Sequence, residues 1–125
     1  MLRTQFTLSS VLAGAILSLG VAEPLAAEEF RVIDSADRFV TLISGRELRR
    51  LGIRLTVTPQ GEIEGRAFGA PVTGDWTWQG GYFCRDLFWN GDDLGYNCQL
   101  VQESGDTLRF TSDQGAGMSA DLSLQ

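Results

Sequence analysis

The chain has 125 residues, a net charge of −6, no histidine and ten basic residues, all of them arginine. Nucleic acid is a poor partner, because the chain has no basic run to displace counterions from phosphates. Without histidine or lysine it cannot form Ser-His-Asp or Cys-His nucleophiles, histidine-ligated zinc or a Schiff-base lysine. The acidic balance instead favours a cationic protein or a small ligand as partner.

The first 27 residues have the pattern of a secretory signal peptide. Arg3 supplies the positive start, residues 6–22 form an uncharged apolar run, and Ala26-Ala27 provide small residues before Glu28. The alternative is a membrane anchor, but the run is short for a span of about 20 residues and lacks a flanking basic cluster. We therefore expect a signal peptide at 1–27 and a single β domain at 28–125. The expected location is periplasmic or secreted, with membrane contact only through an uncleaved signal.

Residues 28–33 are predicted to be extended, and a short helix is predicted to follow. Ser35 is a suitable N-cap, and a helix to about residue 44 would place Phe39 and Ile43 on one face. The same apolar run is also compatible with a strand, so the helix and the strand remain alternatives.

From residue 45 onwards the pattern is that of an antiparallel β protein. Segments of alternating apolar and polar residues are separated by turns rich in Gly, Pro, Asn and Asp. The predicted strands are 53–58, 62–67, 72–79, 82–89, 95–103, 107–111 and 118–124. A meander of this kind can pair the exposed backbone groups of its two edge strands by closing into a barrel. The predicted fold class is therefore mainly β: a small antiparallel, barrel-like meander with a short N-terminal helix and one disulfide.

The disulfide is predicted between Cys84 and Cys98, the only two cysteines. Two cysteines in an exported chain favour a disulfide. The alternative is a free catalytic thiol, which has no histidine to activate it.

Direct pairing of the two cysteines predicts the register of the central hairpin. It aligns Arg85 with Asn97 and Phe88 with Leu94, and it places the reversal on residues 90–92. Opposed residues of antiparallel strands have Cα separations of about 4.5–5.5 Å, which suits a disulfide.

The same hairpin carries a candidate binding face. In the predicted register the polar Arg85, Asn97 and Gln99 share a face with aromatic and apolar residues, which is the composition of a recognition site. On the preceding strand, two tryptophans share a face. The candidate ligand-binding residues are Arg85, Asn97, Gln99, Trp76, Trp78 and Trp89. The alternative is a core hairpin in which Asp75 or Asp86 neutralises Arg85 and the tryptophans fill the barrel.

Other chemistry-bearing patterns have simpler explanations. Glu62 and Glu64 lie about 6.5 Å apart on one strand face, near the spacing of glycosidase acid pairs, but a solvated strand face explains them. Asn90, Asp92 and Asp93 lack the terminal Glu and central Gly of a calcium loop, so a turn explains them. We predict no catalytic residue, no metal and no cofactor.

Most of residues 45–120 resemble a known family. The segments that carry the resemblance are GRELRRLGIRLTV, GEIEGRAFGAPVTGDWTWQGGYFCRDL, DLGYNCQLV and LRFTSDQGAG. They resemble small exported proteobacterial proteins that often carry the label dihydrodipicolinate reductase, a family with no established function to transfer. The label implies a nicotinamide-dependent enzyme with a Rossmann domain. This chain lacks the glycine fingerprint, the catalytic histidine pair and the catalytic lysine of that enzyme.

The predicted function is that of an exported, non-enzymatic, β-barrel-like protein that binds an unknown protein or small ligand. Two alternatives stay open. One is the NAD(P)H-dependent dihydrodipicolinate reductase of the family label. The other is a periplasmic hydrolase inhibitor, because small periplasmic barrels that inhibit proteases or lysozyme share export, size, one disulfide and a Trp-rich meander.

Overall fold

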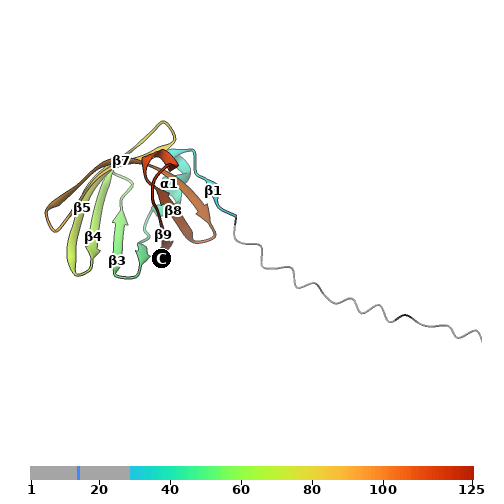
Figure 1. Ribbon diagram of the computed structural model, residues 1–125, viewed down its shortest axis with the longest axis horizontal. Coiled ribbons are helices and arrows are strands. Elements are labelled where there is room, and N and C mark those ends of the chain that lie inside the picture. The colour runs from blue at the N-terminus through green and yellow to red at the C-terminus, as the bar shows by residue number, and fades with distance from the viewer. Residues whose placement is uncertain (1–13, 15–28) are drawn as a thin grey trace, which may run out of the picture.

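The computed structural model describes Gly14 and residues 29–125 (Figure 1). The predicted signal peptide, apart from Gly14, lies outside the described residues. The elements are β1 (Arg31–Val32), α1 (Ala36–Ile43), β2 (Leu48–Arg50), β3 (Ile53–Val57), β4 (Glu62–Ala67), β5 (Ala70–Gln79), β6 (Tyr82–Trp89), β7 (Asp92–Ser104), β8 (Thr107–Thr111), the 3₁₀ turn η1 (Asp113–Gly115) and β9 (Ser119–Leu124). Within the described residues, no helix has the length and apolar character needed to cross a membrane.

Strands β2 to β9 form a closed barrel of eight antiparallel strands in chain order. Each strand pairs with the next, and β9 closes the barrel by pairing with β2 through Leu48–Leu124 and Arg49–Ser123. Two backbone hydrogen bonds of 2.9 Å between Glu47 and Gln125 extend this closure. Strand β1 pairs with the C-terminal part of β7. The predicted mainly β, barrel-like fold is therefore confirmed.

Helix α1 blocks one end of the barrel. Ser35 caps it as predicted, accepting a hydrogen bond from the backbone N–H of Arg38 at 3.2 Å. Phe39 is fully buried and contacts the rings of Trp76, Trp78, Phe83 and Phe110, with centroid distances of 5.2–6.4 Å. Of the two open alternatives for this segment, the helix is the one the structure contains.

The turns divide between the two ends of the barrel, because successive connections of an up-and-down barrel alternate. The end near α1 carries the polar and glycine turns at 58–61, 80–81 and 105–106. The opposite end, which we call the mouth, carries the turns at 51–52, 68–69, 90–91 and 112–118. Helix α1 leaves the mouth uncovered.

The β6–β7 hairpin has the predicted cysteine register but a different turn. Cys84 opposes Cys98 in a disulfide, and Arg85 opposes Asn97. The predicted pairing of Phe88 with Leu94 is wrong, because Phe88 opposes Asp93.

The reason for the different pairing is the conformation of the turn. Asn90 and Gly91 have φ values of 50° and 83°, as a two-residue hairpin turn of the Asn-Gly type requires. A β-bulge between Asp86 and Phe88 absorbs the one-residue slip. Gly95 has φ 86° there, a conformation that glycine adopts without steric cost.

One strand of the barrel was not predicted. Strand β2 is three residues long, and only Leu48 at its start is buried. Its pattern is too short to show alternation, although its pairing with β9 is what closes the barrel. The other strands match the predicted segments, with ends moved by up to three residues.

Candidate ligand-binding site

The mouth gathers most of the exposed large apolar side chains of the described chain. Leu51 is 94% exposed, Met118 86%, Phe68 71% and Leu94 54%, and each lies on or beside a mouth turn. Single exposed apolar residues are normal, but a contiguous group marks an interaction or ligand site. The helix-blocked end has no comparable group among its turns.

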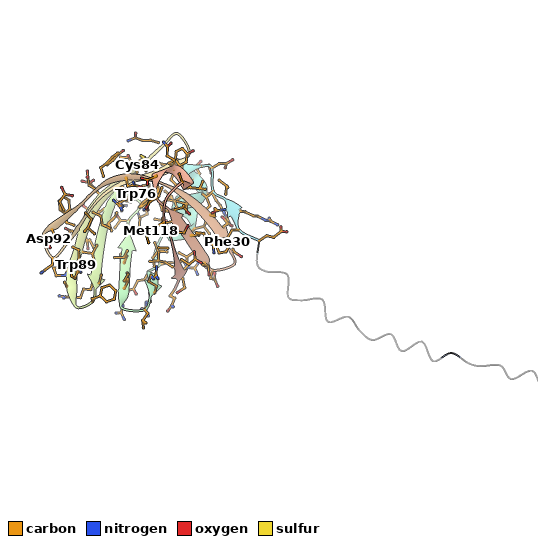
Figure 2. All side chains as sticks on the ribbon, in the orientation of Figure 1. Phe30, Trp76, Cys84, Trp89, Asp92 and Met118 are labelled. Atoms are coloured by element: carbon orange, nitrogen blue, oxygen red, sulfur yellow. A yellow bond between two sulfur atoms is a disulfide. The ribbon has the colours of Figure 1, made fainter. Side chains whose placement is uncertain are left out.

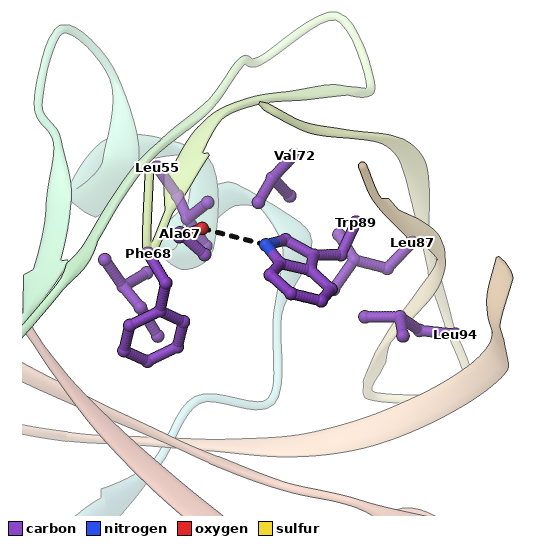
Figure 3. Close-up of a pocket in the computed structure, with 8 residues that line it drawn as sticks. Leu55, Ala67, Phe68, Val72, Leu87, Trp89 and Leu94 are labelled. Carbon is purple, nitrogen blue, oxygen red and sulfur yellow. Dashed lines mark hydrogen bonds between the residues drawn. The ribbon is translucent and has the colours of Figure 1, made fainter. Parts of the chain in front are cut away.

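Behind this rim lies an apolar pocket of about 350 Å³, which we call the mouth pocket. Its walls come from β3 to β7 and the 68–69 turn: Ile53, Leu55, Ala67, Phe68, Val72, Leu87, Trp89 and Leu94. Figure 3 shows Phe68, Leu87, Trp89 and Leu94 among the side chains that line this pocket. A volume of this size lies at the lower end of the range for small-molecule sites.

Trp89 is fixed across the mouth pocket by its indole N–H. Its Nε1 donates a 2.8 Å hydrogen bond to the backbone oxygen of Ala67 (Figure 3). Ala67 is the last residue of β4, and Trp89 is the last residue of β6, so the indole reaches across the end of β5. The polar atom of Trp89 is therefore satisfied while its ring remains available as an apolar wall.

Phe68 holds its place on the rim in a strained backbone conformation. Its φ is 52°, and Gly69 beside it has φ 79°. Glycine and asparagine adopt this region easily, but a bulky side chain there is an outlier that costs about 1–2 kcal/mol. The Phe68 ring lies over Gly52, where an added Cβ would approach the ring to 2.7 Å. Such strain often marks a functional position.

A second, deeper space of about 190 Å³, which we call the inner cavity, lies inside the barrel. It shares Ile53, Leu55 and Leu87 with the mouth pocket, so the two spaces adjoin. Most of its walls are apolar, and its polar members are Arg50, Arg85 and Gln99.

Arg85 is the charged residue that the barrel partly buries. Its Nη1 donates a 2.7 Å hydrogen bond to the backbone oxygen of Gly95, which the bulge presents. Desolvation by burial lowers the pKa of the Arg85 guanidinium, while the charge of Asp86 opposes the shift. A half-buried guanidinium without an ion-pair partner is electrostatically unfavourable, and an incoming anion would relieve this.

No carboxylate among residues 29–125 forms an ion pair with Arg85. Asp75 and Asp86 oppose each other on β5 and β6, at positions that alternate with those facing the interior. The expectation that one of them neutralises Arg85 directly is therefore not met.

The predicted binding face points into the barrel, but its residues lie at different places along the barrel interior. Gln99 lines the inner cavity with Arg85 and donates to the Ser112 hydroxyl at 3.3 Å. Asn97 does not line either space. Its amide donates to the Asp113 carboxylate at 2.7 Å and accepts from the Asp113 backbone N–H at 3.0 Å, which fixes η1 to β7.

Trp76 and Trp78 lie in the core, toward the end of the barrel that α1 blocks, and Figure 2 shows Trp76 near Cys84 and well separated from Trp89. Trp76 is 7% exposed and donates its indole N–H to the backbone oxygen of Thr58 at 2.9 Å. Trp78 stacks on Phe39. Neither lines the mouth pocket or the inner cavity. Their packing corresponds to the core alternative considered for these tryptophans.

The sequence did not single out Phe68, Leu94, Leu55 or Val72 as site residues. The available signal was an aromatic residue before Gly69, between two strands that need a tight turn. Leu94 was assigned to a regular strand pair, and the bulge instead places it beside the pocket.

A groove of about 590 Å³ also lies on the outside of the barrel, over β2, β3 and β4. Its charged residues include Glu47, which forms ion pairs with Arg49 at 2.6 Å and Arg54 at 3.6 Å. Solvated ion pairs of this kind are common on protein surfaces. The larger volume therefore does not make this groove the better site.

The fold and the two adjoining spaces define a class: a small closed β-barrel, blocked at one end and open at an apolar mouth. Comparison of the chain with protein-family models, with curated proteins and with solved structures gave no match. In the part of the chain that the structure describes, no group of three or more His, Cys, Asp or Glu side chains is arranged to hold a metal ion.

Proposed function

We propose that the protein is an exported binding protein that takes a small, mainly apolar molecule into the mouth of its barrel. The observation that carries the proposal is the mouth pocket itself, about 350 Å³ in volume and lined by eight apolar residues. Ligand sites are concave, mostly apolar and largely preformed. The rest of the mature domain would serve as the rigid support of this pocket.

The packing of the barrel supports a preformed site. The blocked end is filled by aromatic side chains around Phe39, and the disulfide joins two strands of the wall. A rigid wall lowers the ordering cost that binding would otherwise incur. The mouth pocket is then the part of the interior left for a ligand.

The proposal includes export to the periplasm or the cell exterior. It is supported by the signal-like pattern of residues 1–27 and by the Cys84–Cys98 disulfide. Disulfides persist in oxidising compartments and are rare in the cytosol. Mass spectrometry of exported material is expected to find a chain that begins near Glu28, and an intact N-terminus in the inner membrane would contradict this part.

The test is a fluorescence titration of the mature domain with N-phenyl-1-naphthylamine, an uncharged apolar probe. We expect saturable binding that Leu94→Asn weakens strongly and Val32→Asn leaves unchanged. The two residues make a matched pair, because Leu94 is 54% exposed at the mouth and Val32 is 55% exposed on β1. Absence of saturable binding, or equal loss in both variants, would contradict the proposal.

The alternatives from the sequence have separate readouts. Micromolar binding of NADPH in calorimetry would favour the enzyme of the family label. Stoichiometric capture of a cationic hydrolase that Leu94→Asn abolishes, without uptake of the apolar probe, would favour an inhibitor whose contact surface is the mouth rim.

A further inference from the structure

We propose that the ligand is a single-chain amphiphile with a carboxylate head, bound head-inward, with the carboxylate at Arg85 in the inner cavity and the chain in the mouth pocket. This inference rests on the proposed function and adds the chemical class and orientation of the ligand. Its physical basis is the division of the barrel interior into an apolar outer space and a cationic inner one.

The charges facing the two spaces are of one sign. The mouth pocket is lined only by apolar residues. The inner cavity adds Arg50 and Arg85, and neither space has a carboxylate among its lining residues. The acidic residues that give the chain its net charge of −6 line neither space. Local charge therefore complements an anion even though the whole molecule is acidic.

The guanidinium group of Arg85 is already oriented in the protein without a ligand. Arg85 Nη1 donates a hydrogen bond to the Gly95 oxygen at 2.7 Å. Within residues 29–125, this is the hydrogen bond that the guanidinium makes. An arginine has five N–H donors in a fixed planar arrangement that matches a carboxylate. The Gly95 contact therefore orients the group and leaves further donors for an incoming anion.

Gln99 supplies a second polar group in the inner cavity. Its amide nitrogen donates to Ser112, so its side-chain oxygen and nitrogen have a fixed orientation. The side-chain amide can donate its other hydrogen to a carboxylate oxygen. Arginine and glutamine together would satisfy both oxygens of the head group.

The chain of the amphiphile has a continuous apolar path to the exterior. The inner cavity and the mouth pocket share Ile53, Leu55 and Leu87. Arg85 precedes Leu87 and Trp89 on the same face of β6, so the cation, the shared wall and the rim follow one another along one strand. A chain that leaves Arg85 along this face would emerge between Phe68, Trp89 and Leu94.

The experiment compares decanoate with 1-decanol by calorimetry on the mature domain. Both place a ten-carbon chain in the mouth pocket, but only decanoate carries the charge. A charge-assisted hydrogen bond predicts about 10- to 100-fold tighter binding of decanoate. Affinity is also expected to rise about fourfold for each methylene from hexanoate upwards until the pocket is filled.

Arg85→Met tests the head group separately from the pocket. We expect it to remove the preference for decanoate while binding of 1-decanol persists, which also shows that the barrel is folded. The matched control is Arg66→Met. Arg66 donates to the backbone oxygen of Gly69 at 3.0 Å near the mouth, but its side chain is on the outside of the barrel. This control removes the same charge without touching the inner cavity, so it is expected to keep the preference.

Each outcome decides one of the two proposals. Equal affinity of the wild-type domain for decanoate and 1-decanol would overturn the carboxylate assignment and leave the apolar site standing. Loss of the preference in Arg66→Met to the same extent as in Arg85→Met would also overturn it, because a long-range field would then explain the effect. Binding of neither compound would contradict the proposed function itself. If Arg85→Met does not fold, the wild-type comparison still decides the assignment.

Discussion

At the scale of single residues, the clearest departure from relaxed geometry is Phe68. The barrel has a neighbouring two-residue turn at the same end, and there the equivalent position, with φ 50°, is occupied by Asn90. Asparagine tolerates this conformation and phenylalanine does not. The chain therefore accepts a local cost at the one mouth turn where the side chain lines the pocket. This is the pattern expected where stability is exchanged for function.

We predict that Phe68→Asn stabilises the domain and weakens binding of an apolar probe. Relief of the left-handed conformation should raise the free energy of unfolding by about 1 kcal/mol. For a domain of this size, the melting temperature should rise by about 4–8 °C per kcal/mol. Loss of the aromatic wall should raise the dissociation constant of N-phenyl-1-naphthylamine.

The reciprocal variant is Asn90→Phe, which places phenylalanine at nearly the same φ in the neighbouring turn. It should lower the melting temperature by a similar amount. If Phe68→Asn instead lowers the melting temperature, the contact of the Phe68 ring with Gly52 outweighs the backbone strain, and the functional interpretation of the strain fails.

The sequence predicted the position of a side chain correctly where alternation along a strand alone determines which face it occupies. Arg85, Gln99 and Trp89 were placed on one face of the hairpin, and all three line the two spaces in the barrel. Leu94 could not be placed, because its position depends on a bulge that compensates for the Asn-Gly turn. The register of a bulged strand depends on its pairing with neighbouring strands. The pattern of apolar and polar residues along one strand carries no information about that pairing.

At the scale of elements, the disulfide joins the neighbouring strands β6 and β7 of the barrel wall. Replacing Cys84 and Cys98 with alanine should lower the free energy of unfolding by up to about 3 kcal/mol, since the bond closes a loop of sequence separation 14. The loss will be smaller if the hairpin persists in the unfolded chain. Urea titration of both proteins measures it.

The same double variant should lose ligand affinity more steeply than its fraction unfolded explains, because Arg85 follows Cys84 directly on β6. Full retention of stability and affinity would show that the bond has no structural role. Free thiols in the natively folded protein would contradict both the pairing and the proposal of export.

Helix α1 is fixed to β7 by a two-bond contact between Arg38 and Glu103, at 2.7 and 2.9 Å. The hydrogen bond from Arg38 is the main reason why the pKa of Glu103 lies below its ordinary value, and burial opposes it. A carboxyl whose folded pKa is lowered contributes stability above its unfolded pKa. This contribution is lost as the pH falls through the folded pKa. We therefore predict that stability falls on acidification below about pH 4.5.

Glu103→Gln should flatten this acid dependence in urea titrations between pH 3 and pH 7. Asp121→Asn makes a matched second variant, because the pKa of Asp121 is lowered by the corresponding hydrogen bond from Arg109. Acid dependence identical to that of the wild type in both variants would show that these contacts do not couple to folding.

The elements themselves were largely predictable, for separable reasons. The serine N-cap and the apolar face made the helix one of two alternatives, and the long strands followed from alternation. Strand β2 could not be found, because three residues with one buried side chain carry no period. Its strand character comes from pairing with β3 and β9, which are distant contacts.

At the scale of the whole molecule, the barrel closes because the two edge strands of the meander would otherwise leave their backbone N–H and C=O groups unpaired. The sequence indicated closure, but it did not indicate which interior region would remain unfilled. That depends on how far the aromatic cluster around Phe39 extends along the barrel, and this cluster occupies the end that α1 blocks. Gly65 and Gly74 let the neighbouring strands approach closely, because a Cβ at either position would collide with the backbone oxygen of Arg54 or Asp86. The mouth is the part of the barrel interior that this packing leaves open.

We propose that a small apolar molecule enters the barrel at the mouth. It is tested most directly by an NMR titration of labelled residues 28–125 with 1-decanol, following the Trp89 indole N–H and the methyl groups of Leu55, Leu87 and Leu94. We predict saturable shifts of these signals with one dissociation constant, while signals from Val32 and Tyr96 stay in place. Saturable shifts confined to the outer face, or no saturable shift at the mouth residues, would contradict entry of the ligand at the mouth.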